Sequence, residues 1–154
     1  MGGSMKRTLA IFALIAASPL AAKPRPPVEH IGAPTLNGAR LPFSEAVRVG
    51  DLLFLSGQLG RRADGTLLAD FDAQARQVMD NIGTVLATAK VGWGDVVKCT
   101  VMLDDMANWP AFNKIYVTYF TDGKFPARSA FGADGLALGA ALEVECIAHA
   151  PTKK

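Results

Sequence analysis

Three charged residues near the carboxyl end of this 154-residue chain have side chains suited to chemistry. Arg128 follows Pro126 at the start of an expected strand, and Glu143 and Glu145 lie within a later apolar run. A guanidinium offers a planar pair of donors that matches a carboxylate, and a partly desolvated carboxylate can accept and return a proton. The pattern predicts that Arg128 and Glu143 bind a small carboxylate and move a proton beside it. A purely structural Arg–Glu ion pair is the alternative interpretation.

Strands must bring these residues together. Residues 43–49 alternate in polarity and residues 52–55 are strongly apolar, with Gly50 and Asp51 between them. This pattern predicts a β-hairpin. The second strand runs into Ser56 and Gly57, where the glycine allows a neighbour or a ligand to approach the backbone closely. Residues 96–103 predict a further strand.

Two helices are expected between these strands. Residues 70–90 place apolar side chains at three- and four-residue steps, which predicts a helix lying on a sheet. Asp70 or Asp72 can cap its start, and Gly92 lies just past its end. Residues 109–120 predict a second helix. Asp104 and Asp105 precede it, and we interpret them as cap and first-turn charges.

The element order is therefore β-β-α-β-α-β-β, an α+β domain with two helices on one face of a mixed sheet. Val47, Val49, Leu53 and Leu55 lie in the hairpin strands, on one side or the other. The sheet face without helices is expected to be apolar. Since uncovered apolar faces are typical of subunit interfaces, an oligomer is expected.

Composition indicates a globular domain, with 50% hydrophobic and 19% charged residues. Removing a leader that contains Lys6 and Arg7 leaves 14 of the 16 basic residues against 14 acidic ones, so the charges cancel. A neutral domain lacks the positive footprint of nucleic-acid binding. The cysteine spacing and the two isolated histidines, His30 and His149, do not suggest zinc ligands, and both histidines are expected to be inert.

Cys99 and Cys146 each lie inside an apolar run. We predict two small, unpaired core residues. A disulfide between neighbouring strands is the alternative.

The amino terminus has the pattern of a targeting segment. Residues 1–4 are expected to be an expression scar and residues 5–22 a secretory signal, with a basic start, an apolar stretch and a small residue at Ala22. A proline-rich lead-in (23–37), a domain (38–150) and a tail (151–154) follow. The prediction is export, to a periplasm. A membrane anchor is the alternative, and a cytoplasmic location follows if the segment is not a functional signal.

Two motifs give the chain a resemblance to a known family. One is Pro126-Ala127-Arg128-Ser129, and the other is Leu142-Glu143-Val144-Glu145, with Ser56-Gly57-Gln58 upstream. In these residues, and over about Gly38 to Ala148, the chain resembles the RidA (YjgF/YER057c/UK114) family of reactive-intermediate deaminases.

The resemblance implies a chorismate-mutase-like fold, a homotrimer with clefts between subunits, and no metal or organic cofactor. It implies that Arg128 grips a substrate carboxylate and that Glu143 positions or activates water. Ser56 and Gly57 contribute contacts to the substrate, and Asn113 takes the place of the family's site asparagine. The implied activity is hydrolysis of small 2-enamino or 2-imino acids to 2-oxo acids and ammonia.

Two departures from the family pattern concern the site. Phe43 stands where the archetypal deaminases have a tyrosine, and it cannot donate a hydrogen bond. Ala130 replaces a frequent cysteine, which slightly widens the pocket. A non-catalytic binder of small carboxylates in the same inter-subunit cleft is therefore the alternative function.

Overall fold

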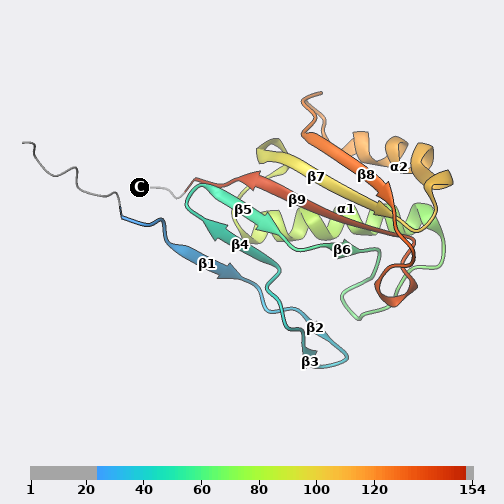
Figure 1. The fold of residues 1–154 in the computed structure, drawn as a ribbon, viewed down its shortest axis with the longest axis horizontal. Coiled ribbons are helices and arrows are strands. Elements are labelled where there is room, and N and C mark those ends of the chain that lie inside the picture. The colour runs from blue at the N-terminus through green and yellow to red at the C-terminus, as the bar shows by residue number, and fades with distance from the viewer. Residues whose placement is uncertain (1–23, 152–154) are drawn as a thin grey trace, which may run out of the picture.

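The computed structural model describes residues 24–151. A sheet with strand order β1-β4-β5-β9-β7-β8, in which β6 also pairs with β9, carries both helices on one face (Figure 1). The strands are β1 (Val28–Ile31), β2 (Thr35–Leu36), β3 (Ala39–Arg40), β4 (Ala46–Val49), β5 (Leu52–Leu55), β6 (Gln58–Leu59), β7 (Val96–Leu103), β8 (Ala127–Gly132) and β9 (Leu142–His149), and the helices are α1 (Phe71–Thr88) and α2 (Trp109–Tyr116). The predicted α+β class and the two helices on one face are confirmed.

Helix α1 begins and ends close to the predicted bounds. The Asp70 carboxylate accepts a hydrogen bond of 2.8 Å from the Ala73 N–H and so caps the first turn. At the other end the left-handed backbone belongs to Lys90, with φ 63°, and not to Gly92. Gly92, which was expected just past the end of α1, lies four residues after its last residue, Thr88, and does not terminate the helix.

The second helical region changes pitch along its length. Helix α2 ends at Tyr116 and continues as a 3₁₀ turn over Val117–Tyr119. Asp105 does act as a cap, but of a short 3₁₀ helix, Met106–Asn108, that precedes α2. Its carboxylate accepts a hydrogen bond of 2.8 Å from the Ala107 N–H.

The hairpin of β4 and β5 lies in the middle of the sheet. Leu53 and Leu55 are buried beneath the helices, whereas Val47 and Val49 lie half-buried on the opposite face. The structure thereby assigns each of these four residues to one side. Phe43 lies outside the strand that was expected to include it.

The proline-rich lead-in contributes to the fold. Its strand β1 pairs with β4 at the edge of the sheet, and β2 forms a separate two-stranded ribbon with β3. The predicted order omitted these strands and β6. They are only two to four residues long, too short for an alternating pattern to be recognised.

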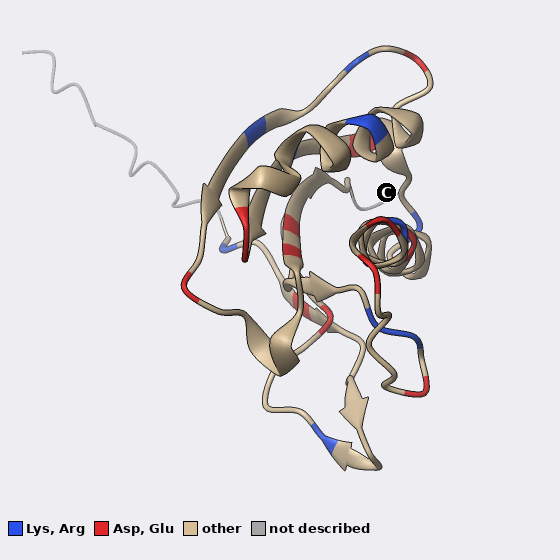
Figure 2. Cartoon of the chain, turned by 90° about the vertical axis from the view of Figure 1, so that its right-hand side faces the viewer, with Lys and Arg blue, Asp and Glu red and all other residues tan. Residues whose placement is uncertain are grey.

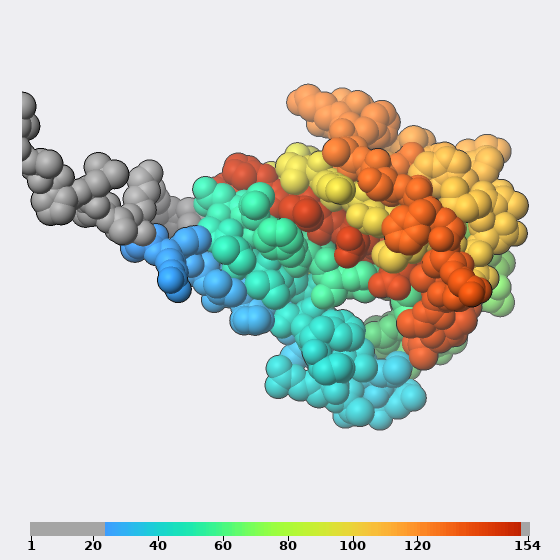
Figure 3. All heavy atoms as spheres, in the orientation of Figure 1, coloured from blue at the N-terminus to red at the C-terminus, as the bar shows by residue number. Residues whose placement is uncertain are grey.

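The antiparallel pair β7–β9 forms the centre of the core. From Cys99 onward in β7, after a bulge near its start, and throughout β9, every second residue faces the helices and is buried, including Val101, Leu103, Leu142 and Val144. The residues between them point to the other face. In Figure 3 the strands β5, β9, β7 and β8 are visible side by side on that face, with no helix over them.

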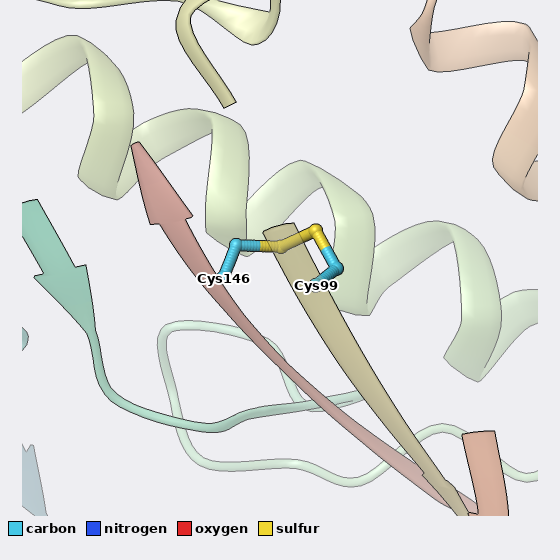
Figure 4. The surroundings of a disulfide bond; sticks show 2 residues. All are labelled: Cys99 and Cys146. Atoms are coloured by element: carbon cyan, nitrogen blue, oxygen red, sulfur yellow. A yellow bond between two sulfur atoms is a disulfide. The ribbon is translucent and has the colours of Figure 1, made fainter. Parts of the chain in front are cut away.

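Cys99 and Cys146 form a disulfide, so the prediction of two unpaired core residues was wrong (Figure 4). They are directly opposite each other in the β7–β9 register and point to the same buried face. The sequence shows neither which strands pair nor in which register. For this reason the sequence did not show that the two cysteines, each in its own apolar run, lie next to each other.

Among the described residues, neither helix combines the length and the apolarity that a membrane crossing requires. The predicted signal at residues 5–22 and the expected scar at residues 1–4 lie outside the described part of the chain.

The disulfide should contribute measurably to stability. It links positions 47 residues apart, and loop-closure entropy for such a loop corresponds to about 4 kcal/mol of unfolding free energy. We expect urea unfolding under reducing conditions to have a clearly lower midpoint than under oxidising conditions, at one fixed protein concentration. The double variant Cys99→Ala/Cys146→Ala should show no effect of reductant. Equal midpoints for the wild type in both conditions would contradict this assignment.

Candidate functional site

Arg128 lies on β8, and three side chains of helix α2 contact its guanidinium. The guanidinium carbon is 4.4 Å from the ring centroid of Trp109 and 4.4 Å from that of Tyr116. One terminal nitrogen, Nη2, donates a hydrogen bond of 2.7 Å to the Asn113 side-chain oxygen. Cation–π contacts and a short hydrogen bond together fix the plane of the guanidinium.

This arrangement leaves a defined direction for a ligand. Two aromatic rings occupy the neighbourhood of the guanidinium, and Asn113 takes one nitrogen. Arg128 has no carboxylate partner within salt-bridge distance among the described residues. A carboxylate that approaches in the guanidinium plane would find donors ready to form charge-assisted bonds.

Tyr116 remains neutral beside this cation. Burial raises the pKa of its phenol to about 12, and the positive charge of Arg128 opposes that rise only in part. A neutral ring keeps the electron-rich face that attracts a guanidinium. Trp109, Asn113 and Tyr116 follow one another at steps of four and three residues, which places them on one side of α2. Sequence reasoning identified only Asn113, although this spacing was a usable signal for the two rings.

Glu143 lies on β9 and packs against the backbone of Gly57. A methyl group built on Gly57 would overlap the Glu143 carboxylate, so no larger residue fits there without moving it. The pKa of Glu143 is raised above the ordinary value of 4.5, first by burial and second by the neighbouring charge of Glu145. Such a carboxylate is suited to take up a proton.

A pocket of about 420 Å³ surrounds Glu143. It is lined by Phe43, Val47, Phe54, Leu55, Ser56, Gly57, Glu143 and Glu145. The predicted residues Phe43, Ser56 and Gly57 therefore lie with Glu143. Glu145 lines the same pocket. Figure 2, in which acidic residues are red and basic residues blue, shows two red bands close together on one strand of the sheet.

Ser56 has part of its hydrogen-bonding capacity already in use. Its hydroxyl donates to the Ser44 carbonyl oxygen over 2.7 Å. A wider hollow next to this pocket contains His30, whose Nδ1 lies 3.3 Å from the Ser44 hydroxyl. Neither the Ser44 nor the Ser56 hydroxyl donates a hydrogen bond to Glu143.

Arg128 and Glu143 lie on opposite faces of the sheet within one chain. Arg128 is the register partner of Cys99, which faces the helices, whereas Glu143 is the register partner of Met102, which faces away. Partners in a sheet project to the same side, so the two functional side chains project in opposite directions. Ala130, two residues after Arg128, packs against the core on the helix side. The predicted site is thus present as two separate halves.

The residues of the described part of the chain include no cluster of three or more His, Cys, Asp or Glu side chains able to hold a metal ion. The chemistry of the two halves is that of a cation, a carboxylate and backbone groups.

Comparisons with known proteins agree with this architecture. The family model described as Endoribonuclease L-PSP matches residues 35–150. The 2-iminobutanoate/2-iminopropanoate deaminase of Mus musculus is 38% identical over 109 residues, which cover 70% of this chain and 80% of the mouse protein. The chain belongs to the RidA (YjgF) family. The resemblance of its two motifs to that family is confirmed.

Solved structures of the family superimpose on the domain. The yjgF gene product from E. coli gives a TM-score of 0.72 at 32% identity, covering 79% of this chain and 98% of the bacterial one. E. coli TdcF, solved with bound serine, gives a TM-score of 0.72 at 29% identity with the same two coverages. The RidA-like fold is therefore established for this chain.

The contact between Gly57 and Glu143 can be tested directly. In Gly57→Ala the new methyl group should push the flexible end of Glu143 towards solvent, since its carboxylate oxygen would otherwise lie inside the methyl. Exposure removes the main cause of the raised pKa, so the pKa of Glu143 should fall towards its ordinary value. Carboxyl-carbon NMR titration measures this.

Gly94→Ala is the matched control, because a methyl group there meets nothing within 4 Å. Its Glu143 titration should equal that of the wild type. An unchanged pKa of Glu143 in Gly57→Ala would show that Gly57 does not determine the carboxylate's position.

Proposed function

We propose that this protein is a deaminase that hydrolyses 2-enamino or 2-imino acids to 2-oxo acids and ammonia. The observation that carries the proposal is the preset guanidinium of Arg128, which contacts the rings of Trp109 and Tyr116 and has no carboxylate partner among the described residues. Names among the relatives support it, since the mouse protein is named as a deaminase of two such acids.

Arg128 would select the substrate by its carboxylate. Each charge-assisted hydrogen bond contributes about 1.5–3 kcal/mol, and a planar fork can form two in parallel. Asn113 fixes the rotation of the guanidinium through its 2.7 Å hydrogen bond. Neutral imines without a carboxylate would lack this anchor and bind poorly.

Glu143 would handle the protons of hydrolysis. A 2-enamino acid is first protonated on carbon to give the imine. Glu143 then takes a proton from water as the water oxygen bonds to the imine carbon, and the C=N bond becomes a single bond. Glu143 returns this proton to the nitrogen. It then takes the proton of the new hydroxyl group and passes it to the nitrogen as the C=O bond forms, the C–N bond breaks and ammonia leaves. The raised pKa of Glu143 suits it for both transfers.

The complete site would require two copies of the chain. Arg128 and Glu143 project from opposite faces of one sheet, so neither can reach a ligand held by the other in the same protomer. We infer a homotrimer in which the Arg128 half of one subunit meets the Glu143 half of its neighbour. A cyclic head-to-tail assembly brings two different surfaces together in this way at every interface.

A non-catalytic binder of small carboxylates is the second candidate. Phe43 supplies no hydroxyl, and the Ser56 hydroxyl is already bonded to Ser44, so few donors surround Glu143. E. coli TdcF, whose structure contains serine, holds a ligand of this kind. The Arg128 half would serve a binder as well as an enzyme.

We further propose that the protein is exported, in keeping with the signal pattern at residues 5–22. The Cys99–Cys146 disulfide supports this location, because structural disulfides persist in oxidising compartments and are rare in a reducing cytosol. The substrate would then be an imino acid formed outside the cytoplasm, by an oxidase or dehydrogenase acting on amino acids.

Imine hydrolysis is tested by generating imino acids with an amino-acid oxidase and following 2-oxo acid formation. The wild type should accelerate the step above the spontaneous rate. Arg128→Ala should lose at least about tenfold in kcat/KM, since two charge-assisted bonds are removed. Arg128→Lys keeps the charge but not the planar fork, and should recover only part of the loss.

Arg62→Ala, which removes an exposed arginine of a loop, is the matched control and should behave as the wild type. A wild-type rate equal to the spontaneous rate for both small and bulky imino acids would reject the deaminase. Binding of 2-oxobutanoate, lost in Arg128→Ala, would then favour the binder.

Mixing two impaired variants tests whether the site is shared between subunits. Arg128→Ala retains Glu143, and Glu143→Gln retains Arg128. In trimers refolded from an equal mixture, about one quarter of the sites should combine both intact halves, so about a quarter of wild-type activity should return. Each variant refolded alone should stay well below that level, at about a tenth of wild-type activity or less. A mixture no more active than its two parents would mean that both residues act from the same subunit.

A further inference from the structure

A polar pocket of about 470 Å³ lies on the helix side of the sheet, between α1, the loop that follows β6 and the segment around Pro34. Its charged and amide side chains are those of Glu45, Gln58, Arg61, Arg62, Gln77 and Asn81. None of these six residues lines the pockets around Glu143 and Arg128. The polar pocket is therefore separate from both halves of the proposed site.

The loop that carries Arg61 and Arg62 is tied to α1 and to itself. The Asn81 side-chain nitrogen donates hydrogen bonds of 3.0 Å to the Leu59 carbonyl oxygen and of 2.9 Å to that of Arg61. The Arg62 N–H donates to the Thr66 carbonyl oxygen over 2.9 Å. The backbone that carries both guanidinium groups is thus fixed before a ligand binds, which lowers the entropy cost of binding.

The β2–β3 ribbon supports the other wall of the pocket. This ribbon pairs with no strand of the main sheet, and in Figure 1 it lies beside the loop that follows β6. Gly65 of that loop has φ 91°, and a methyl group built there would lie 3.3 Å from the Leu36 side chain. The Leu41 N–H donates to the Pro34 carbonyl oxygen over 2.9 Å and closes the ribbon. Loop and ribbon together form the rim of the pocket.

Charges of opposite sign line this pocket without neutralising each other. Glu45 and Arg61 are half-buried, and Arg62 is exposed. Among the described residues, none of the three has a partner of opposite charge within salt-bridge distance. The pKa of the Asp64 carboxyl, outside the lining, is lowered first by hydrogen bonds with Thr66 and to a smaller extent by the charge of Arg62. Glu45 and Arg61 are therefore the principal charges of the pocket.

The glutamines of the lining add hydrogen-bond acceptors. The Gln77 side-chain nitrogen donates to the Asn81 side-chain oxygen over 2.9 Å, and the Gln58 nitrogen donates to the Ser56 carbonyl oxygen over 3.2 Å. Because these nitrogens are engaged, each glutamine has its side-chain oxygen left to accept a hydrogen bond. An ammonium group, which has three donors and no acceptor, suits such surroundings.

We infer that this pocket binds an α-amino acid, with the ligand's carboxylate at Arg61 and its ammonium group at Glu45. A zwitterion supplies a partner to both charges, whereas a simple anion leaves the half-buried Glu45 unpaired. Two arginines and one glutamate give the lining an excess of one positive charge, so acidic amino acids should bind more tightly than basic ones. The volume falls within the range of roughly 300–1,000 Å³ found for small-molecule sites. The inference does not depend on the deaminase activity.

Isothermal titration with L-glutamate tests the inference. Each titration uses the full chain with Arg128→Ala, so that the carboxylate-binding half of the proposed site does not contribute. N-acetyl-L-glutamate keeps both carboxylates but has no ammonium group. It should bind at least about tenfold more weakly than L-glutamate, since a charge-assisted contact is lost. L-lysine should also bind more weakly than L-glutamate.

Two further substitutions assign the contacts. Glu45→Gln should remove most of the difference between L-glutamate and its N-acetyl derivative, because the ammonium group loses its charged partner. Arg61→Gln should weaken the binding of both ligands at least about tenfold. Arg76→Gln is the matched control, because it removes an exposed arginine of α1 that does not line the pocket. It should leave every affinity unchanged.

Three results would overturn the inference. The first is a chain with Arg128→Ala that does not bind L-glutamate, and the second is equal affinity for L-glutamate and its N-acetyl derivative. Amide NMR provides the third. Bound L-glutamate should shift the signals of Gln58, Arg61 and Ala63, and shifts confined to the surroundings of Glu143 would place the ligand in the other pocket.

The amino-acid site and the deaminase can fail separately. Arg61→Gln leaves both halves of the proposed site intact, so it should retain the wild-type rate of 2-oxo acid formation. If imino acids are not hydrolysed but L-glutamate binds as described, the deaminase is rejected and the amino-acid site stands. If imino acids are hydrolysed and L-glutamate does not bind, the amino-acid site is rejected and the deaminase stands.

Discussion

The register between β7 and β9 is the constraint on which the rest of the structure depends. It sets Cys99 against Cys146 on the helix side, and Met102 against Glu143 on the other. Strand β8 pairs with β7 in parallel, and Arg128 lies opposite Cys99. The Arg128 side chain therefore projects to the helix side, as the Cys99 side chain does. A slip of one residue would exchange the faces of every side chain on the shifted strand. The position of each half of the site therefore follows from one strand pairing, which the disulfide locks.

The two halves differ in how they are held. Arg128 is fixed by side chains, two rings and an amide from one helix, whereas Glu143 is fixed by the absence of a side chain at Gly57. The first device preserves charge and direction for binding. The second brings a carboxylate close to backbone and partly out of water, which favours proton uptake. Binding and proton transfer are thus provided by physically different means on different surfaces.

Much of this could be predicted from sequence. The period of 3.6 residues identified both helices, and the motifs around Arg128 and Glu143 identified the family. Local patterns cannot reveal which strands pair, and this accounts for the wrong prediction about the cysteines. It also explains why one stretch was expected to hold the site, although its arginine and glutamate project from opposite faces. Trp109 and Tyr116 were assigned to a helix without a role, since stacking on an arginine of another element is a tertiary contact.

The disulfide also has a consequence for biosynthesis. Synthesis proceeds from the amino terminus, so Cys99 emerges well before Cys146, which is close to the carboxyl end. With only two cysteines in the chain, oxidation within one molecule has a single outcome. No scrambled isomer exists that an isomerase would have to correct. Oxidation late in folding can therefore stabilise the native sheet by its disulfide. It cannot stabilise a misfolded form of the same chain through a non-native pairing of cysteines.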